Sequence, residues 1–329
     1  MRFFNINQDK SVRICTAIPH SSFLIPHFSF PIPYSSFAHC NRIENEVFSM
    51  SRQLTPVQLV ERSIQRKYRK ELWTPFMLAV KRYELIQAGD RVAVCVSGGK
   101  DSMLLAKLMQ LLQRYSDVPF EAKYLVMDPG YSPANRRRIE ENAARLGLPV
   151  EIFGTDIFDV ANAAEKNPCY LCARMRRGHL YSRARALGCN KIALGHHFND
   201  VIETTVMAMF YGAQLQGMMP KVRSANFEGM ELIRPLYCVH EDDIIAWKRY
   251  NGLEFLQCAC RFTEGMAQSG DGVGASKRQE IKRLLRDMRR DNPDVEKSVF
   301  NAIHAVSLDT FPGWKSKGVE HSFLEWYDR

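Results

Sequence analysis

Long hydrophobic runs are missing from this sequence. No stretch of about 18 apolar residues occurs, so no membrane-spanning helix and no membrane partner are expected. A convincing signal peptide is also lacking, and the nine cysteines are spread over 329 residues rather than crowded as in a small secreted disulfide scaffold. We therefore expect a cytoplasmic protein, whose thiols are reduced, catalytic or metal-bound.

The composition is that of a folded, basic protein. Hydrophobic residues make up 46% and charged residues 25% of the chain, enough for one large or two ordinary domains. Lys and Arg number 45 against 36 Asp and Glu, a net charge of +9. The excess is concentrated in segments 136–138, 173–191 and 275–290. These segments predict a surface that binds nucleic-acid phosphates, with solvated helix faces as the alternative, above all for 275–290.

The first 49 residues differ from the remainder. They contain no glycine, and four prolines interrupt their apolar stretches. We expect residues 1–49 to form a disordered or loosely docked extension. A sharper hypothesis is that Met50 is the physiological start and that the upstream segment is an artefact, because amphipathic, charge-rich sequence begins there.

Strands and helices alternate after a helical segment over 50–90. Apolar runs at 91–96, 120–127, 150–154 and 191–195 precede segments of helical period at 103–115, 132–146, 171–187 and 200–211. A strand at 231–235 and a helix at 241–251 follow. This order predicts an α/β domain over 91–262 with a doubly wound parallel sheet, whose ligands bind at the carboxyl ends of the strands. The C-terminal part, 263–329, is expected to hold a Gly-rich loop and helices at 275–290 and 293–306.

A glycine pair follows the first predicted strand, in SGGKDS at 97–102. Two glycines permit a tight turn, and the amino terminus of the following helix offers unpaired N–H groups to an anion. The motif is neither a Walker A loop nor a dinucleotide-binding fingerprint. It predicts a phosphate-binding loop, with an ordinary strand-to-helix turn as the alternative.

Two further clusters carry polar chemistry. GHHFND, 195–200, ends another strand. We expect its two histidines to point in different directions, so that they share no metal, and a purely structural role is the alternative for His197. Cys169 and Cys172 form a C-x-x-C motif at the predicted start of a helix, where thiolates are favoured. Alone, the motif permits a redox dithiol, a zinc site or an iron–sulfur site. Cys258 or Cys260 can add a third ligand.

Together these motifs resemble a known family. SGGKDS matches the PP-loop of the N-type ATP pyrophosphatases, which split ATP between its α and β phosphates and adenylate a substrate. The order of the remaining motifs is similar to that of the tRNA 2-thiocytidine synthetases, the TtcA family, over residues 50–306. These motifs are C-x-x-C, RRGxLY (176–181), ALGHHxxD (193–200), MFYG (209–212), GMMPK (217–221), IRPL (233–236) and a late cysteine.

The resemblance implies a PP-loop fold and an ATP-dependent tRNA sulfurtransferase, which adenylates C2 of cytidine 32 in the anticodon loop and replaces its oxygen by sulfur. Its implied cofactors are ATP, magnesium and a 4Fe-4S cluster with an open iron. Asp101, Cys169 and Cys260 are expected to carry the chemistry. By position in the motifs, the resemblance implies that the phosphates are bound by Ser97, Gly98, Gly99, Lys100 and Ser102, and magnesium by Asp101. It implies that Met127 contacts the adenine and that the α-phosphate is lined by Gly195, His196 and Asp200. The implied cluster ligands are Cys169, Cys172 and Cys260.

The late cysteine departs from the family pattern, which has C-x-x-C where this chain has C-x-C; Cys260 is preferred over Cys258. The implied partners are tRNA and a sulfur donor such as cysteine desulfurase, and a homodimer is compatible with them. Three alternatives stay open. They are another PP-loop tRNA-modifying enzyme, for 2-thiouridine or lysidine, a zinc-dependent thiolase, and a non-enzymatic metal-containing RNA-binding protein.

Overall fold

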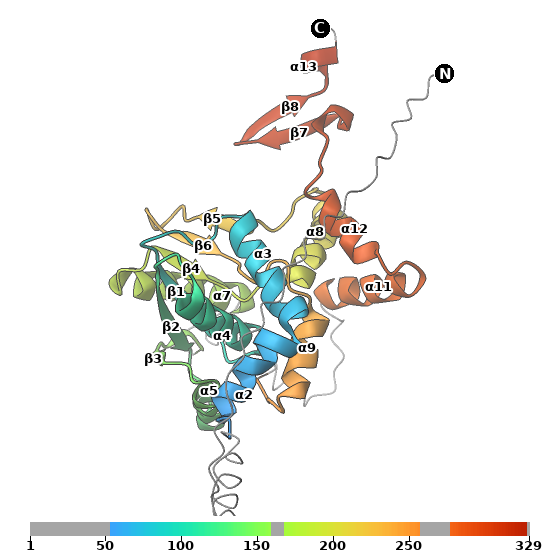
Figure 1. Ribbon diagram of the computed structural model, residues 1–329. Helices are drawn as coiled ribbons and strands as arrows, with labels where there is room; N and C mark the ends of the chain where they lie inside the picture. The colour runs from blue at the N-terminus through green and yellow to red at the C-terminus, as the bar shows by residue number, and fades with distance from the viewer. Residues whose placement is uncertain (1–52, 159–167, 257–276, 328–329) are drawn as a thin grey trace, which may run out of the picture. The chain divides into compact units, whose positions relative to one another are not determined.

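A computed structural model of the chain describes residues 53–158, 168–256 and 277–327. The described residues fold around a six-stranded sheet of order β3-β2-β1-β4-β6-β5 (Figure 1). All neighbouring strands are parallel except β5, which runs antiparallel to β6. The strands are β1 (Arg91–Cys95), β2 (Glu121–Asp128), β3 (Val150–Gly154), β4 (Lys191–Ala193), β5 (Lys221–Arg223) and β6 (Glu231–Ile233).

Helices cover both faces of the sheet because the central strands are apolar on both sides. In β1, Val92 and Val94 belong to one hydrophobic cluster, whereas Ala93 and Cys95 belong to another. The first cluster is completed by α4 (Lys100–Tyr115), α5 (Pro133–Leu146), α8 (Phe198–Gly212) and α9 (Glu241–Tyr250). The second is covered by α7 (Pro168–Ala186). The predicted doubly wound α/β fold is confirmed.

The N-terminal helical segment packs on the first of these faces. It consists of α2 (Pro56–Arg62), two π-helical segments, η1 (Ser63–Lys67) and η2 (Arg69–Trp73), and α3 (Thr74–Arg82). Lys107, which is fully buried on α4, donates to Glu61 of α2 at 2.7 Å and to the carbonyl oxygen of Leu146 at 2.8 Å. This buried cation joins α2 to α4 and α5, and so fixes the helix that follows the glycine loop.

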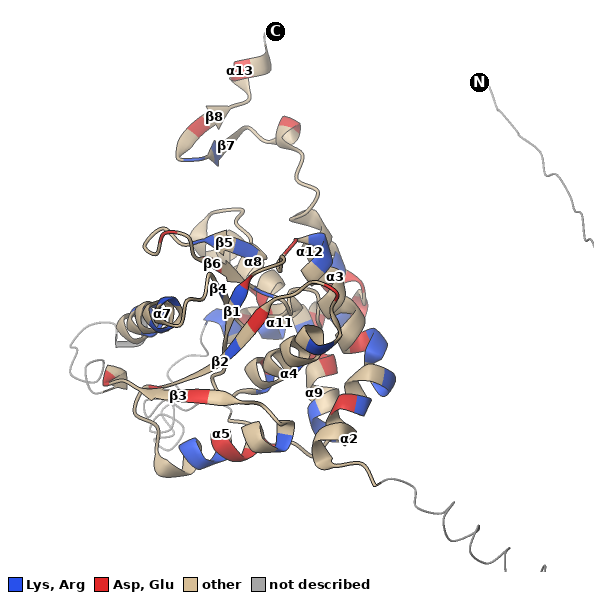
Figure 2. Ribbon diagram, turned by 60° about the vertical axis from the view of Figure 1, so that its left-hand side comes forward, with Lys and Arg blue, Asp and Glu red and all other residues tan. Residues whose placement is uncertain are grey.

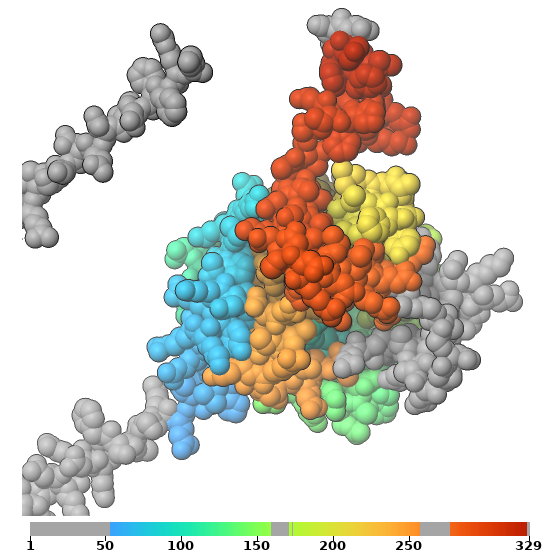
Figure 3. Space-filling view, turned by 90° about the vertical axis from the view of Figure 1, so that its right-hand side faces the viewer, coloured from blue at the N-terminus to red at the C-terminus, as the bar shows by residue number. Residues whose placement is uncertain are grey.

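The C-terminal part contains more than the two predicted helices. After α11 (Lys277–Asp291) and α12 (Val295–Ala302), both of which pack on α8, come a short 3-10 turn (Leu308–Thr310), a hairpin of β7 (Gly313–Ser316) and β8 (Val319–Ser322), and α13 (Leu324–Tyr327). The hairpin turn, Lys317-Gly318, has φ of +50° and +82°, as a tight hairpin turn requires. Figure 3 shows α11 and α12 beside α9 on one face.

Every strand and helix that the sequence predicts between 91 and 251 is present, with ends that differ by at most three residues. The prediction missed β5 and the hairpin, whose three- and four-residue strands are too short to show a period. The predicted extension at 1–49 and the Gly-rich loop lie outside the described residues. No helix in the described ranges is long and apolar enough to cross a bilayer.

Candidate active site

The glycine loop between β1 and α4 is shaped by one glycine and closed by one serine. Gly98 has φ of +83°, and a Cβ there would lie 2.7 Å from the side chain of Ile139. Ser102 accepts from the amide of Ser97 at 3.0 Å and donates to the carbonyl of Gly99 at 3.0 Å. The loop is thus preorganised, and the first turn of α4 keeps the unpaired amide groups that every helix start presents.

A third glycine brings the histidine motif against this loop. A Cβ on Gly195, just after β4, would lie 3.0 Å from the backbone nitrogen of Ser102 and 3.1 Å from the carbonyl carbon of Asp101. Backbone atoms cannot move aside as a flexible side chain can. Gly195 therefore permits the end of β4 to touch the start of α4, which places the two motifs at one edge of the sheet.

Six of the predicted binding residues line one cavity of about 370 Å³ at this edge, and Cys95, Arg176 and Leu180 line it with them. Four others do not line it, since Gly98 and Gly99 form the turn, and the side chains of Lys100 and Asp200 are held in ion pairs. Because Arg176 and Leu180 come from α7, the cavity joins the phosphate loop to the cysteine-bearing helix. The six residues are Ser97, Asp101, Ser102, Met127, Gly195 and His196.

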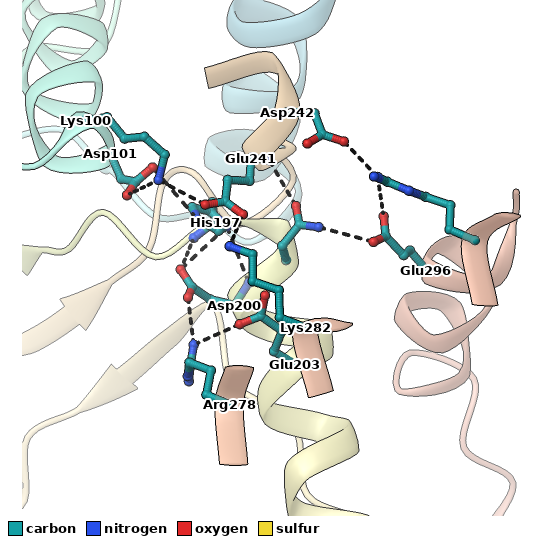
Figure 4. Close-up of polar contacts among 12 residues, drawn as sticks. Lys100, Asp101, His197, Asp200, Glu203, Glu241, Asp242, Arg278, Lys282 and Glu296 are labelled. Carbon is teal, nitrogen blue, oxygen red and sulfur yellow. Dashed lines mark hydrogen bonds and ion pairs between the residues drawn. The ribbon is translucent and has the colours of Figure 1, made fainter. Parts of the chain in front are cut away.

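Lys100 lies between two carboxylates (Figure 4). Its Nζ is 3.1 Å from Asp101 Oδ2 and 3.1 Å from Glu241 Oε1, while Lys282 of α11 holds the other oxygen of Glu241 at 2.5 Å. Burial opposes the charge on Glu241, but these two lysines lower its pKa to about 2. Burial opposes the charge on Lys100 too and by itself would lower its pKa, but the carboxylates of Asp101 and Glu241 raise this pKa above its ordinary value. Sequence reasoning missed Glu241, which starts a helix 141 residues away from Lys100.

A second ion-pair group surrounds Asp200. Arg278 of α11 lies 2.8 Å from Asp200 Oδ1 and 3.3 Å from Glu203 Oε2, and it donates to Thr204 at 3.2 Å. Glu203 is buried, which raises its pKa to about 7. Arg278 and Lys282 therefore dock α11 onto the two acidic groups beside the phosphate loop (Figure 4).

The adjacent histidines lie in different surroundings. His197 is buried and caps α8: its Nδ1 accepts from the amide of Asp200 at 3.4 Å, and Asp200 accepts from the amide of His197 at 3.1 Å. His196 lines the cavity instead, and its Nδ1 is buried without a partner among the described residues. Burial lowers the pKa of His196 to about 4, so this side chain is neutral at pH 7.

The cysteine prediction falls partly outside the described residues. Positions 169 and 172 are one turn apart at the start of α7, and Cys172 is partly buried. Cys258 and Cys260 lie in the range that the structure leaves out. Within the described ranges, no three His, Cys, Asp or Glu side chains form a metal-binding group. Cys95 and Cys189 are buried, whereas Cys238 is only partly buried.

The basic blocks on α7 and α11 differ in their surroundings (Figure 2). On α11, Arg278, Lys282 and Arg289 each lie within ion-pair distance of carboxylates on α8, α9 or α12. On α7, no described carboxylate pairs with Arg174 or Arg177, both of which are exposed. A large part of the α11 charge is thus neutralised inside the protein. On α7, Arg183 pairs with Glu151, whereas Arg174 and Arg177 are available to an external anion.

Comparison with known proteins identifies the class and the family. Residues 61–260 match the PP-loop domain, which places the chain in the PP-loop class. It is 36% identical to the tRNA-cytidine(32) 2-sulfurtransferase of Citrifermentans bemidjiense over 232 residues, 69% of this chain and 87% of the relative. It is 34% identical to that of Bordetella pertussis over 280 residues, 80% of this chain and 83% of the relative. The chain belongs to the tRNA-cytidine(32) 2-sulfurtransferase family, and the resemblance found in its motifs is confirmed.

A solved structure shares the fold. The U34-tRNA thiolase NcsA from Methanococcus maripaludis, described with its 4Fe-4S cluster, aligns with a TM-score of 0.54 over 70% of this chain and 76% of that chain. The sequence identity is 19%, so the likeness concerns the fold alone.

Proposed function

We propose that this chain is an ATP-dependent tRNA sulfurtransferase that converts cytidine 32 into 2-thiocytidine. The observation that carries the proposal is the cavity in which the phosphate loop faces α7. Asp101 and Ser102 line it from one side, and Arg176 and Leu180 line it from the helix that starts with C-x-x-C. Adenylation acts on O2 and sulfur transfer on C2, two bonded atoms of one base, so both functions are needed at one place. The named activity of the relatives supports the tRNA substrate.

The reaction needs the cytosine O2 turned into a leaving group. O2 attacks the α-phosphorus of ATP, the bond from that phosphorus to the bridging oxygen breaks, and pyrophosphate leaves. A nucleophilic sulfur at the oxidation level of sulfide then bonds to C2, the C2–O2 bond breaks, and AMP leaves with the oxygen. In the proposal, the amides of Gly98 and Gly99 hold the pyrophosphate group and Met127 contacts the adenine. Neutral His196 donates a hydrogen bond to an oxygen of the α-phosphate.

Magnesium suits one atom of this cavity. Asp101 Oδ1 is buried and has no hydrogen-bond partner among the described residues, although it borders the phosphate loop. A buried carboxylate oxygen with an unused lone pair is a typical ligand for a divalent cation that also binds phosphate. We assign magnesium to Asp101, where the cation would neutralise charge on the departing pyrophosphate.

The iron–sulfur cluster is assigned to Cys169, Cys172 and Cys260. Two cysteine positions one helical turn apart at a helix amino terminus, followed by arginines, favour thiolate ligands. When bound, a cluster with an open iron supplies the place where sulfur is carried to the base. We further propose a cytoplasmic location, a sulfur donor such as cysteine desulfurase and a homodimeric assembly.

The test is thiolation of a defined tRNA by anaerobically purified protein. We expect tRNA-dependent release of pyrophosphate and 2-thiocytidine at position 32, detected by nucleoside mass spectrometry, and no product when uridine occupies that position. Asp101→Asn is expected to lower pyrophosphate release by at least about a hundredfold. Asp117→Asn, an exposed carboxylate beyond the end of α4, is the matched control. Absence of tRNA-dependent pyrophosphate release from the wild type would reject an adenylating enzyme.

A further inference from the structure

A second, larger cavity adjoins the first. It has a volume of about 810 Å³, within the range of small-molecule sites, and shares Leu194 and His196 with the smaller cavity. One of its walls is α7, through residues such as Tyr181. The opposite wall is formed by β5, β6 and the turn between them, which carries Phe227. The proposed ATP chemistry does not use this cavity.

Two buried nitrogen atoms at the cavity wall have no partner among the described residues. They are Nε of Arg234, which follows β6, and Nδ1 of His196. Another nitrogen of the Arg234 guanidinium, Nη1, donates a hydrogen bond to the carbonyl oxygen of Met219. A buried polar atom without a partner costs free energy, so its presence in a folded protein points to a ligand that supplies the missing hydrogen bond.

The cavity also offers an aromatic surface. Phe227 stacks on Tyr181, with ring centroids 4.9 Å apart and an angle of 16° between the rings. Tyr181 is buried, and Phe227 is partly exposed on its turn. An aromatic ring held flat against a buried neighbour is a rigid platform for a nucleobase.

Exposed positive charge lies at the rim. Arg174 and Arg177 contribute to the lining, are exposed, and pair with no carboxylate in the described part of the chain. Arg223 on the opposite wall has a side chain that is 92% exposed, and its Nε lies 3.6 Å from Glu231. Guanidinium groups on both sides of an aromatic cavity match a base flanked by two phosphates.

We propose that this larger cavity binds the target nucleotide after it has turned out of the anticodon loop, with its base against Phe227 and its acceptor edge, O2 and N3, at Arg234. Arg174, Arg177 and Arg223 contact the flanking phosphates. The shared wall at His196 brings O2 next to the α-phosphate in the smaller cavity. This assignment rests on the proposed function, and it makes Phe227 and Arg234 the residues that select and orient the base.

The experiment uses an anticodon stem-loop with the fluorescent base pyrrolocytosine at position 32 and the full-length holoprotein. Binding to the wild type should change the fluorescence, because the base leaves its stack and enters the cavity. Phe227→Leu keeps an apolar contact with Tyr181 but removes the aromatic face, and it should abolish most of this change; Phe227→Tyr should retain it. Arg234→Gln should lower kcat/KM for thiolation of tRNA by roughly ten- to a hundredfold.

The affinity for a non-hydrolysable ATP analogue should stay within about twofold in these variants, which also verifies that they fold. Arg249→Gln, an exposed arginine on α9, is the control and should thiolate like the wild type. Arg174→Gln should weaken stem-loop binding and reduce its salt dependence by roughly one counterion. Wild-type thiolation by both Phe227→Leu and Arg234→Gln would overturn the assignment, as would an equal loss of ATP-analogue and stem-loop binding. If the wild type itself forms no thiolated base, the proposed function fails instead.

Discussion

Glu241 on α9 holds Lys100 through one carboxylate oxygen, at 3.1 Å, and Lys282 through the other, at 2.5 Å. Lys100 begins α4, directly after the glycine loop, and Lys282 belongs to α11. One carboxylate on α9 therefore links α11 to the loop of the proposed ATP site. Because its side chain is only 13% exposed, the link is screened little by water.

Glu241→Gln should destabilise the protein by about 2 kcal/mol, since Lys282 loses its carboxylate partner and the partly buried Lys100 keeps only Asp101. The measurement is urea unfolding at pH 7. Glu254→Gln is the control, because Glu254 has a side chain that is 81% exposed and lies 3.8 Å from Arg138; its effect should be below about 0.5 kcal/mol. Equal effects of the two substitutions would contradict the role of Glu241.

The contribution of Glu241 should depend on pH in one direction. Its folded-state pKa, about 2, is below its ordinary value of 4.5, so the contribution is complete above pH 4.5 and is lost as the pH falls toward 2. The difference in unfolding free energy between the wild type and Glu241→Gln should therefore shrink over this interval. A difference that stays constant down to pH 2 would mean that folding does not lower the pKa of Glu241.

Glu203 should show the opposite dependence. Burial raises its pKa from 4.5 to about 7, so the folded protein binds a proton that the unfolded chain releases, and stability is lost as the pH rises from 4.5 through 7. Glu203→Gln mimics the protonated form. The unfolding free energy of this variant minus that of the wild type, measured with urea, should rise by on the order of 2 kcal/mol between pH 5 and pH 8. No change of this difference with pH would contradict the prediction.

The two glycines of the loop should tolerate alanine differently. At Gly98, a Cβ would meet Ile139 at 2.7 Å with the backbone at positive φ, so Gly98→Ala should cost about 2 kcal/mol of stability. At Gly99, φ is −78° and the nearest atom is 3.6 Å away, so Gly99→Ala should fold like the wild type. Thermal unfolding of the two variants side by side tests this, and equal midpoints would refute it.

The cysteines offer a test of the proposed cluster. Cys172→Ser should remove the brown colour and visible absorbance of anaerobically purified protein, because a thiolate ligand is lost. Cys189→Ala is the matched control: Cys189 is buried, burial raises its pKa, and its substitution should leave the spectrum unchanged. A colourless wild type with stoichiometric zinc and full thiolation activity would favour the zinc-dependent alternative.

Much of the fold follows from local patterns in the sequence. The valine-rich run at 91–96 and its successors predict buried parallel strands because their residues are apolar on both faces. The glycine pair at 98–99 and the histidines at 196–197 follow strands directly, so the α/β order alone predicts that they share the ligand-binding edge. The short strands β5, β7 and β8 have too few residues to carry such a pattern.

The sequence by itself determined the α/β class and the family, because each depends on the period or the order of neighbouring residues. Only the tertiary structure decided which charges meet. Glu241 reaches Lys100 across 141 positions, and Arg278 reaches Asp200 across 78. The sequence of the helix at 277–291 shows that it is basic. Whether this charge is neutralised depends on the carboxylates of α8 and α9 that lie beside the helix. Charge pairing is a matter of distance in space, which no spacing along the chain encodes.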